Sequence, residues 1–478
     1  MTTYPPVDAK ILKEFPSVDE GELDRKLCCA LKTLNRKIIV LDDDPTGVQT
    51  VHDVSVYTDW SIESLREAFA EESSLFFVLT NSRSFTKAQT EQAHREIAQN
   101  IVRVSNESGK DFLVISRGDS TLRGHYPEET EVLRSELETL TAKRYDGEVV
   151  YPFFPEGGRY TIGNVHYVKE GQFLIPCGET EFARDKTFGY RSSHLGDWCE
   201  EKTEGRFPSK TCVFVSLESL RACDVEGIAA QLESVCDFRK VIVNSVDYCD
   251  VKVFTLAFLR AVASGKEFLF RSAAAIVKVL GGISDRPLLI KKDLIDPKNK
   301  NGGLIVVGSH VQKTTQQLEA LHQCNYPVQF VEFNQHLALE PDGLEREVTR
   351  VVGLAGEMIS HGQTVVVYTR RDRLDLDTHS KEAQLLISVR ISNAVAGIVE
   401  GLEVRPNFII AKGGITSSDI GTKALKVKRA RVMGQIRPGI PVWMTGPESK
   451  FPEMPYVIFP GNVGEVSTLR EVVETLLE

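Results

Sequence analysis

Three consecutive acids and a glycine turn follow an apolar run near the start of the chain. The run 38–41 leads directly into the acids 42–44 and then into Pro45-Thr46-Gly47. In an open parallel sheet, buried strands read as short apolar runs, and ligands bind beyond the carboxyl ends of the strands. Carboxylates in that position can bind the hydroxyls of a small substrate or take a proton from one. The sequence therefore predicts acidic chemistry at Asp43 and Asp44.

Three further polar clusters follow or adjoin strand-like runs in the same half of the chain, at 80–83, 116–124 and 155–159. If the strands are parallel neighbours, all four clusters converge on one crevice. Arginine has a planar fork that matches a carboxylate, so we expect Arg83 and Arg123 to hold an acidic substrate. The alternative is that Asp43 and Asp44 only cap a turn. The residues predicted to bind the substrate are Thr46, Gly47, Asn81, Ser82, Arg83, Asp119, Ser120, Arg123 and Arg159.

Glycine-rich turns in the C-terminal half indicate a second kind of site. The turns at 308–310 and 412–418 each join a strand-like run to a helix, and a third turn at 459–464 precedes the final helix. Glycines let the backbone approach a ligand, and the N–H groups at a helix N-terminus favour phosphate. A nucleotide is the natural candidate, and magnesium would enter with it. Neither a P-loop nor a GxGxxG fingerprint is present, and helix capping and chain reversal explain the turns about as well. The residues assigned to this site are Ser309, Gly413, Gly414, Ile415, Thr416, Gly461 and Asn462.

Alternating apolar runs and amphipathic stretches must position these residues. Such alternation predicts α/β architecture with largely parallel sheets. The predicted strands are 38–41, 76–79, 112–115, 213–215, 241–243, 304–307, 365–368 and 408–411, and the predicted helices include 61–70, 86–105, 128–140 and 312–322. Turn and linker residues dominate 283–303. We therefore expect two α/β domains, an N-terminal domain of residues 1–295 and a C-terminal domain of residues 296–478.

Composition narrows the possible partners. The 478 residues carry a formal net charge of −10, with no long basic block, so neither nucleic acid nor an anionic membrane is expected as a partner. Residues 1–10 lack an apolar signal region, and no run approaches a membrane span, so we expect a soluble, cytoplasmic protein. The nine cysteines lack zinc spacing and are expected to be reduced, mostly buried thiols. No histidine pair has metal-ligand spacing, so the ligands of any metal remain unknown.

Taken together, these motifs resemble the four-carbon acid sugar kinase family over nearly the whole chain. The resemblance is carried by 43–47, 81–83, the Asp-Ser-Thr-Leu-Arg-Gly hexapeptide at 119–124, and 158–163. In the C-terminal half it is carried by 308–309, 413–416, 438–441 and 461–464. It implies that the N-terminal domain binds a sugar acid and the C-terminal domain binds ATP, with the active site in the interdomain cleft.

The sequence departs from the family pattern in several places. Arg117 stands where a lysine is common, Ile415 replaces the usual acid of Gly-Gly-Asp/Glu-Thr, and Pro45 with 49–53 gives the first turn an atypical continuation. The chain is also longer through 170–210, where 179–185 forms a distinctive polar segment.

The resemblance implies an ATP- and Mg²⁺-dependent kinase that phosphorylates a terminal hydroxyl of a short sugar acid, expected to have four carbons. In this reading Asp43 or Asp44 orients or deprotonates the attacking hydroxyl, Arg83 and Arg123 hold the carboxylate, and the two domains close over both substrates. A homodimer is one possible assembly. Two alternatives remain open: a lyase or isomerase acting on a sugar acid, and a metabolite sensor without turnover.

Overall fold

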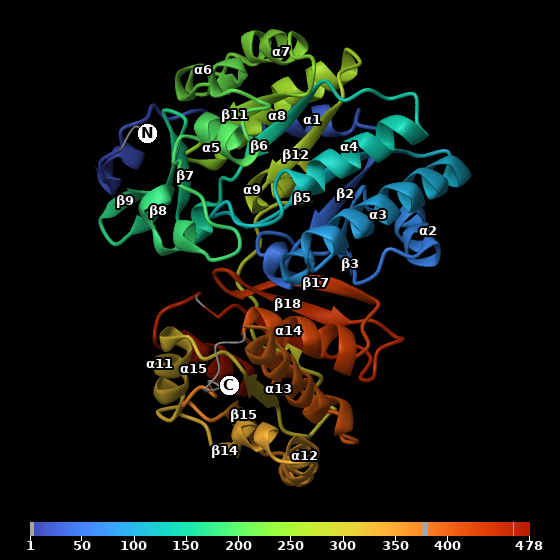
Figure 1. Ribbon diagram of the computed structural model, residues 1–478, viewed down its shortest axis with the longest axis vertical. Helices are drawn as coiled ribbons and strands as arrows, with labels where there is room; N and C mark the ends of the chain where they lie inside the picture. The colour runs from blue at the N-terminus through green and yellow to red at the C-terminus, as the bar shows by residue number, and fades with distance from the viewer. Residues whose placement is uncertain (1–3, 375–380, 462) are drawn as a thin grey trace. The chain divides into compact units, whose positions relative to one another are not determined.

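The computed structural model describes residues 4–374, 381–461 and 463–478. Its contacts divide the chain into two compact units. The first unit contains Met1–Gly47 and Asp59–Asp285, and the second contains Val48–Thr58 and Arg286–Glu478. We describe each unit by itself (Figure 1).

The elements of the first unit alternate along the chain as an α/β protein requires. Its strands are β1 (Val7–Asp8), β2 (Arg36–Asp42), β4 (Leu75–Leu79), β5 (Asp111–Arg117), β6 (Gly147–Tyr151), β7 (Arg159–Ile162), β8 (Val165–Glu170), β9 (Phe173–Pro176), β10 (Val213–Val215), β11 (Arg239–Val243) and β12 (Phe268–Ser272). Its helices are α1 (Glu20–Leu31), α2 (Ile62–Ala70), α3 (Lys87–Ser108), α4 (Glu128–Leu140), α5 (Leu195–Lys202), α6 (Leu217–Arg221), α7 (Val225–Glu233), α8 (Tyr248–Ala263) and α9 (Ala274–Leu280).

The main sheet of the first unit is parallel, with strand order β10-β11-β6-β12-β5-β2-β4. The side chains of β4 are fully buried, as are those of β2 beyond its first residue. This burial explains why the strands read as continuous apolar runs. Helices α2, α3 and α4 lie side by side (Figure 1). A smaller antiparallel sheet has the order β1-β9-β8-β7.

Helix α3 shows how local sequence signals set the ends of these elements. The Thr86 hydroxyl accepts a hydrogen bond from the Gln89 backbone N–H, and the Gln89 side chain accepts one from the Thr86 N–H. This capping box satisfies backbone donors that the first turn would otherwise leave unpaired. The helix ends at Gly109, whose φ of 66° lies in the left-handed region that glycine enters without strain.

The second unit combines a parallel sheet with an antiparallel extension. Its strands are β3 (Ser55–Tyr57), β13 (Leu304–Val307), β14 (Val328–Phe333), β15 (Thr364–Thr369), β16 (Ile409–Lys412), β17 (Arg429–Arg437), β18 (Ile440–Thr445) and β19 (Pro455–Phe459). Its helices are α10 (Lys291–Leu294), α11 (Gln312–Leu321), α12 (Gly343–Ser360), α13 (Lys381–Gly401), α14 (Gly414–Asp419) and α15 (Thr468–Leu477). Strands β19-β16-β13-β15-β14 are parallel neighbours, and β3, β17, β18 and β19 are paired antiparallel in that order.

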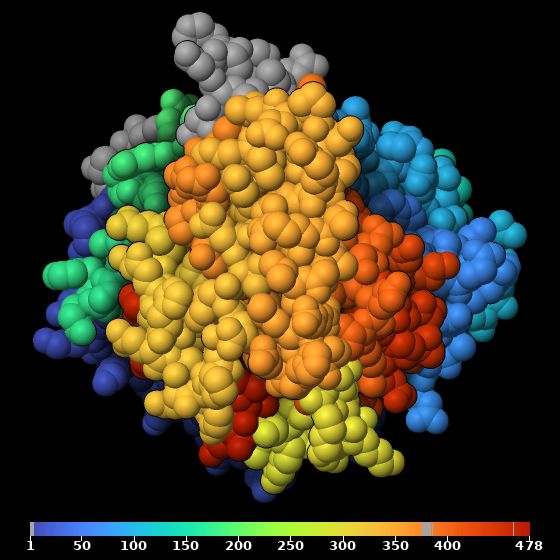
Figure 2. All heavy atoms as spheres, turned by 90° about the horizontal axis from the view of Figure 1, so that it is seen from below, coloured from blue at the N-terminus to red at the C-terminus, as the bar shows by residue number. Residues whose placement is uncertain are grey.

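Helix α12 is amphipathic and lies on the face of the second unit seen in Figure 2. Leu344, Val351, Ala355 and Ile359 are buried at intervals of seven, four and four residues. This spacing places them on one side of the helix, against the sheet, while the opposite side is exposed. The helix thus covers the sheet by the amphipathic pattern expected of a crossover helix.

The division between the units differs from the predicted boundary at 295/296. Residues after Asp285 pack into the second unit: the Leu289 N–H donates to the Gln435 carbonyl at 2.8 Å, and Leu289 and Leu294 belong to the second unit's hydrophobic core. Residues 48–58 also belong to the second unit, because β3 pairs with β17. Turn residues dominate the linker 283–303 in the sequence, yet Leu289 and Leu294 of this linker are core residues.

Candidate active site

Within the first unit, the carboxyl ends of β5, β2 and β4 lie side by side. The register places Asp42 beside Leu79 on one flank and Arg117 on the other, and Arg117 in turn beside Ser272 of β12. The polar clusters that follow β2, β4 and β5 therefore meet at one edge of the sheet, as their placement after apolar runs predicts. The fourth cluster, 155–159, follows β6, the neighbour of β12.

Asp43 and Asp44 are held by one arginine. Arg83 donates to both carboxylate oxygens of Asp43, at 2.6 and 3.2 Å, and its remaining terminal nitrogen lies 3.3 Å from an Asp44 oxygen. The other Asp44 oxygen accepts from the backbone N–H and the hydroxyl of Thr46, at 2.9 and 2.6 Å. Burial opposes ionisation of Asp44, but Arg83 and Thr46 outweigh it and hold the Asp44 pKa below its usual value. Asp44 is thus a fixed anion, and the fork of Arg83 is already occupied by protein carboxylates.

Asp42 differs chemically from its two neighbours. Its side chain is 2% exposed and lies 3.4 Å from Arg117, which is itself buried. Burial, reinforced by the charges of Asp43 and Asp44, raises the pKa of Asp42 to about 7 despite Arg117. A Cβ on Gly47 would lie only 1.7 Å from an Asp42 oxygen, so only glycine can cover this carboxyl group. The structure thus gives Gly47, predicted to bind substrate, a packing role against Asp42.

The 119–124 loop is stabilised by its own polar side chains. Asp119 accepts hydrogen bonds from Nε of Arg123, at 2.7 Å, and from the Thr121 hydroxyl. Burial disfavours the Asp119 anion, but Arg83 and Arg123 lower its pKa well below the usual value. The carbonyl of Ser120 is 2.8 Å from Nε2 of His166, a buried imidazole whose pKa burial lowers to about 4. His166 is therefore neutral at physiological pH and serves to hold the loop.

Asn81 and Ser82 occupy different positions in the turn after β4. Asn81 has a φ of 54°, in the left-handed region that asparagine tolerates better than most residues. Ser82 is fully buried, and its hydroxyl donates to Glu129 at 2.7 Å. The described arrangement therefore directs Ser82 into the protein interior, toward α4.

A second buried arginine, Arg271 on β12, escaped the sequence analysis. It is 2% exposed and donates to the carbonyls of Arg123, Asp119 and Ser272 at 2.9, 3.4 and 3.2 Å. A Cβ on Gly118 would lie 2.5 Å from its guanidinium. Among the described residues, no carboxylate pairs with Arg271. The detectable signal is an arginine directly after the apolar run 268–270, the same pattern that identified Asp42.

In the second unit, the glycine-rich turns meet at the carboxyl ends of β13, β16 and β19. A Cβ on Gly308 would lie 2.4 Å from Oγ1 of Thr416, one on Gly413 would lie 3.1 Å from Cβ of Ser309, and one on Gly461 would lie 3.3 Å from Oγ of Ser309. Gly413 also has a φ of 122°, which disfavours any other residue. The structure thus brings together most of the residues assigned to the nucleotide.

The remaining residues assigned to the nucleotide are placed as follows. Gly414 begins the short helix α14, and Ile415 in its first turn is 69% exposed. Asn462 lies outside the described residues.

Lys412, the last residue of β16, is a buried cation that the sequence analysis did not select. It is fully buried and donates to the carbonyls of Pro460 and Gly461 at 2.6 and 3.2 Å. Burial, together with the nearby charge of Lys313, lowers the Lys412 pKa to about 7. Within the described ranges, Lys412 has no carboxylate partner. It fixes the turn after β19 and places a potential positive charge among the glycines.

Arg371 provides a second cation at the same edge of the second unit. It follows β15 and donates to the Ser309 carbonyl at 2.6 Å and to the Thr315 hydroxyl at 3.0 Å. Burial lowers its pKa, and no described carboxylate forms an ion pair with it. The signal in the sequence is a polar cluster after the apolar run 365–368. Lys412, Arg371 and the helix N-terminus at Gly414 together suit an anionic ligand.

The described part of the chain also contains potential metal ligands and free thiols. No group of three His, Cys, Asp or Glu side chains there could hold a metal ion. The expectation that most cysteines are buried is wrong. Cys177, Cys199 and Cys249 are buried, whereas Cys28, Cys29, Cys223 and Cys236 are exposed, because they lie on helix surfaces and in turns. All nine cysteines are free thiols, as expected.

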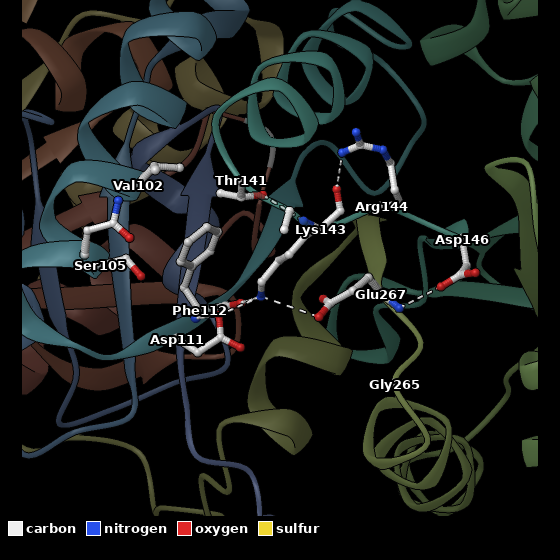
Figure 3. Close-up of a pocket in the computed structure, with 12 residues that line it drawn as sticks. Val102, Ser105, Asp111, Phe112, Thr141, Lys143, Arg144, Asp146, Gly265 and Glu267 are labelled. Atoms are coloured by element: carbon white, nitrogen blue, oxygen red, sulfur yellow. Dashed lines mark hydrogen bonds and ion pairs between the residues drawn. The ribbon is translucent and has the colours of Figure 1, made fainter.

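A separate pocket of about 660 Å³ lies at the amino ends of β5, β6 and β12 (Figure 3). Lys143 bridges Asp111 at 2.6 Å and Glu267 at 3.5 Å, and Arg36 pairs with the same two acids at 2.8 and 2.7 Å. These charges neutralise one another, and they lie at the end of the parallel sheet opposite the acids 42–44. We interpret the pocket as part of a structural ion-pair network rather than as the site of chemistry.

Comparison with known families agrees with this division of chemistry. Residues 38–280 match a family described as the sugar-binding N-terminal domain, and residues 304–469 match one described as the nucleotide-binding C-terminal domain. The matches define a two-domain α/β protein with a carbohydrate-binding half and a nucleotide-binding half. The chain belongs to the four-carbon acid sugar kinase family.

Solved structures confirm the fold class. A Salmonella typhimurium LT2 protein, provisionally described as a tRNA synthase, is 15% identical over 91% of this chain and 98% of that chain, with a TM-score of 0.63. A Haemophilus influenzae protein assigned to the family DUF1537 is 16% identical over 92% of this chain and 100% of that chain, with a TM-score of 0.58. No curated protein matches the sequence. No helix in the described ranges has both the length and the apolar character of a membrane span.

Proposed function

We propose that the protein transfers the γ-phosphoryl group of ATP to a terminal hydroxyl of a short, four-carbon sugar acid. The observation that carries the proposal is that each unit has its own chemically distinct sheet edge. The first unit gathers acids and guanidinium groups around Asp43, Asp44 and Asp119. The second unit gathers glycine turns around two cations that lack described acid partners, Lys412 and Arg371.

Asp44 is the better candidate to orient the acceptor hydroxyl. Its side chain is 18% exposed, whereas that of Asp43 is 2% exposed and has both oxygens on Arg83. Phosphoryl transfer passes through a loose transition state and depends on positioning more than on early proton removal. A carboxylate with a lowered pKa can therefore serve, because its main task is to accept the hydroxyl's hydrogen bond and direct the oxygen.

The carboxylate of the sugar acid requires a cation that still has free hydrogen-bond donors. Arg83 already donates to Asp43 through Nε and one terminal nitrogen, and Arg123 donates to Asp119 through Nε. Arg159 forms no ion pair with a described residue, so we assign it the main share of this binding, with the terminal nitrogens of Arg123 beside it. Burial lowers the pKa of Arg159, and a bound carboxylate would offset that cost.

The residues of the second unit fit a nucleotide phosphate chain. Gly308 and Gly413 let the turns that carry Ser309 and Thr416 pack closely together, and we propose that the N–H groups that begin α14 bind phosphate oxygens. A bound phosphate would give Lys412 an anionic partner, which no described carboxylate provides. When bound, MgATP supplies the phosphoryl group and neutralises part of the charge between the phosphates. We propose that the cation enters with the nucleotide, bound chiefly through its phosphates.

A coupled assay of ADP release over a set of four-carbon sugar acids tests the proposal. We expect ADP release only when both ATP and a suitable acid are present. Asp44→Asn should lower kcat about 100-fold or more, because positioning and proton transfer contribute at least that much. Asp237→Asn, at an exposed turn, should leave the rate unchanged. ADP release that ignores the acid, or an unaffected Asp44→Asn variant, would contradict the proposal. Stabilisation by both ligands without turnover would instead support a metabolite sensor.

A further inference from the structure

The segment between β9 and α5 packs on the 119–124 loop, which carries candidate substrate residues. The Tyr190 hydroxyl donates to the Thr121 carbonyl at 2.6 Å. The rings of His125 and Phe188 meet edge to face, with centroids 4.9 Å apart. Ala183 and Tyr190 are buried in the same hydrophobic cluster as Leu122. The Tyr190 N–H also donates to the Ala183 carbonyl at 3.1 Å, so these contacts hold residues 179–190, which include the polar segment 179–185, against the proposed sugar-acid site.

Phe182 in this segment lies against two arginines of the site. Its ring centroid is 5.1 Å from Cζ of Arg123 and 5.7 Å from Cζ of Arg159. Both distances are within the range of a cation–π interaction. Phe182 is only partly buried. A rigid apolar ring thus stands beside the two guanidinium groups that an acid would approach.

The two arginines beside Phe182 differ in how far nearby acids compensate their positive charge. Arg123 donates through Nε to Asp119 at 2.7 Å, and one of its terminal nitrogens is 3.7 Å from Asp185. Asp185 also accepts from two backbone N–H groups of its own turn, and its pKa is lowered even though burial opposes this, so it stays ionised. Arg159 contacts the Gly157 carbonyl, and its buried Nε has no partner among the described residues. Nearby acids therefore compensate the charge of Arg123, whereas Arg159 is available to bind a carboxylate.

We propose that residues 179–185 make the sugar-acid site selective for a short acid with a single negative charge. Arg159 takes the one carboxylate. The Phe182 ring bounds the space beside it and so excludes longer acids. The Asp185 carboxylate repels a second anionic group from Arg123. This inference rests on the sugar-acid site of the proposed function and assigns specificity roles to two residues that lie outside the motifs shared with the family.

Binding and turnover should be measured separately with three probes. Erythronate is a four-carbon monoanion, gluconate is a six-carbon monoanion, and tartrate is a four-carbon dianion. Isothermal titration of the full chain gives their affinities without nucleotide, and the ADP-release assay gives their kcat/KM values. The variants are Phe182→Ala and Asp185→Asn, with Phe173→Ala as a control at an exposed phenylalanine on β9. Thermal unfolding of each variant checks that it folds.

The wild-type protein should bind erythronate more tightly than gluconate or tartrate. Phe182→Ala should reduce the erythronate-to-gluconate preference about 10-fold or more, as expected when a side chain that bounds an apolar wall is removed. Asp185→Asn should reduce the erythronate-to-tartrate preference about 5-fold, because a nearby like charge is removed at little change in shape. Phe173→Ala should change neither ratio.

Unchanged ratios in both folded variants would overturn the inference, whether or not the enzyme turns over. If Phe182→Ala does not fold, Asp185→Asn alone decides, because it preserves the size of the side chain. Altered binding ratios without any ADP release would support the selectivity and refute the kinase activity.

Discussion

The buried Asp42 leads to a specific prediction about stability and pH. Folding raises its pKa from 3.8 to about 7, chiefly because burial disfavours the anion. Between about pH 4 and pH 7 the folded state therefore keeps a proton that the unfolded state has released. The free energy of unfolding falls as the pH rises through this window. The substitution Asp42→Asn removes the titrating group and preserves its size.

The magnitude follows from the two pKa values. Each pH unit within the window changes the free energy of unfolding by about 1.4 kcal/mol. Integration from pH 5 to pH 8 gives roughly 2.5 kcal/mol of stability that the wild-type chain loses at Asp42. Asp42→Asn should not show this part of the loss. Any further cost of placing an amide beside Arg117 changes stability at both pH values alike and cancels in the difference between them.

Urea unfolding followed by circular dichroism at pH 5, 6, 7 and 8 provides the measurement. The difference in unfolding free energy between pH 5 and pH 8 should be smaller in Asp42→Asn than in the wild type by roughly 2.5 kcal/mol. Asp237→Asn, at an exposed position, should match the wild-type slope. Parallel pH profiles for the wild type and Asp42→Asn would refute the reasoning that Asp42 is protonated in the folded state.

Three other predictions follow from the site. Nucleotide binding at pH 8 should take up a proton, because phosphate raises the Lys412 pKa from about 7. Calorimetry in buffers of different ionisation enthalpy should show this uptake in the wild type and lose it in Lys412→Met. Gly47→Ala should destabilise the protein by about 2 kcal/mol or more, since its Cβ would overlap Asp42, whereas Gly353→Ala on α12, where nothing lies within 4 Å, should not. Arg271→Leu should raise KM for the acid and leave KM for ATP unchanged, because Arg271 binds its neighbour Ser272 and the Asp119 and Arg123 carbonyls of the 119–124 loop. Equal effects on both KM values would contradict that role.

The strands that carry the first site could be predicted from apolar runs alone. β2, β4 and β5 are buried on both faces, so their sequences are continuous and their polar ends stand out. The same pattern correctly located β13, β15 and β16. The antiparallel strands β17 and β18 were not predicted. In β17 the buried residues alternate with arginines and two register shifts interrupt its pairing with β18, whereas β18 contains Pro441, a residue that disfavours a central strand.

The sequence could not show which charged side chains of the site pair with one another. Arg83 looks like a free clamp in the sequence, and only the folded positions of Asp43 and Asp44 reveal that its fork is occupied. Lys412 and Arg271 were overlooked because each is the charged end of an apolar strand, where a single basic residue resembles an ordinary solvent-facing terminus. Burial, not residue type, distinguishes them.

The position of β3 has a consequence for how the chain can be divided. Residues 48–58 come from the N-terminal half of the sequence, yet they supply the strand that covers β17. A fragment beginning at Arg286 would leave β17 as an unprotected edge, the kind of surface that recruits other strands and aggregates. A fragment ending at Asp285 would carry β3 without its partner. Neither of these two fragments therefore corresponds to one complete structural unit. Expression of the nucleotide-binding half alone will require residues 48–58 to be grafted back, for example by circular permutation, before its folding can be judged.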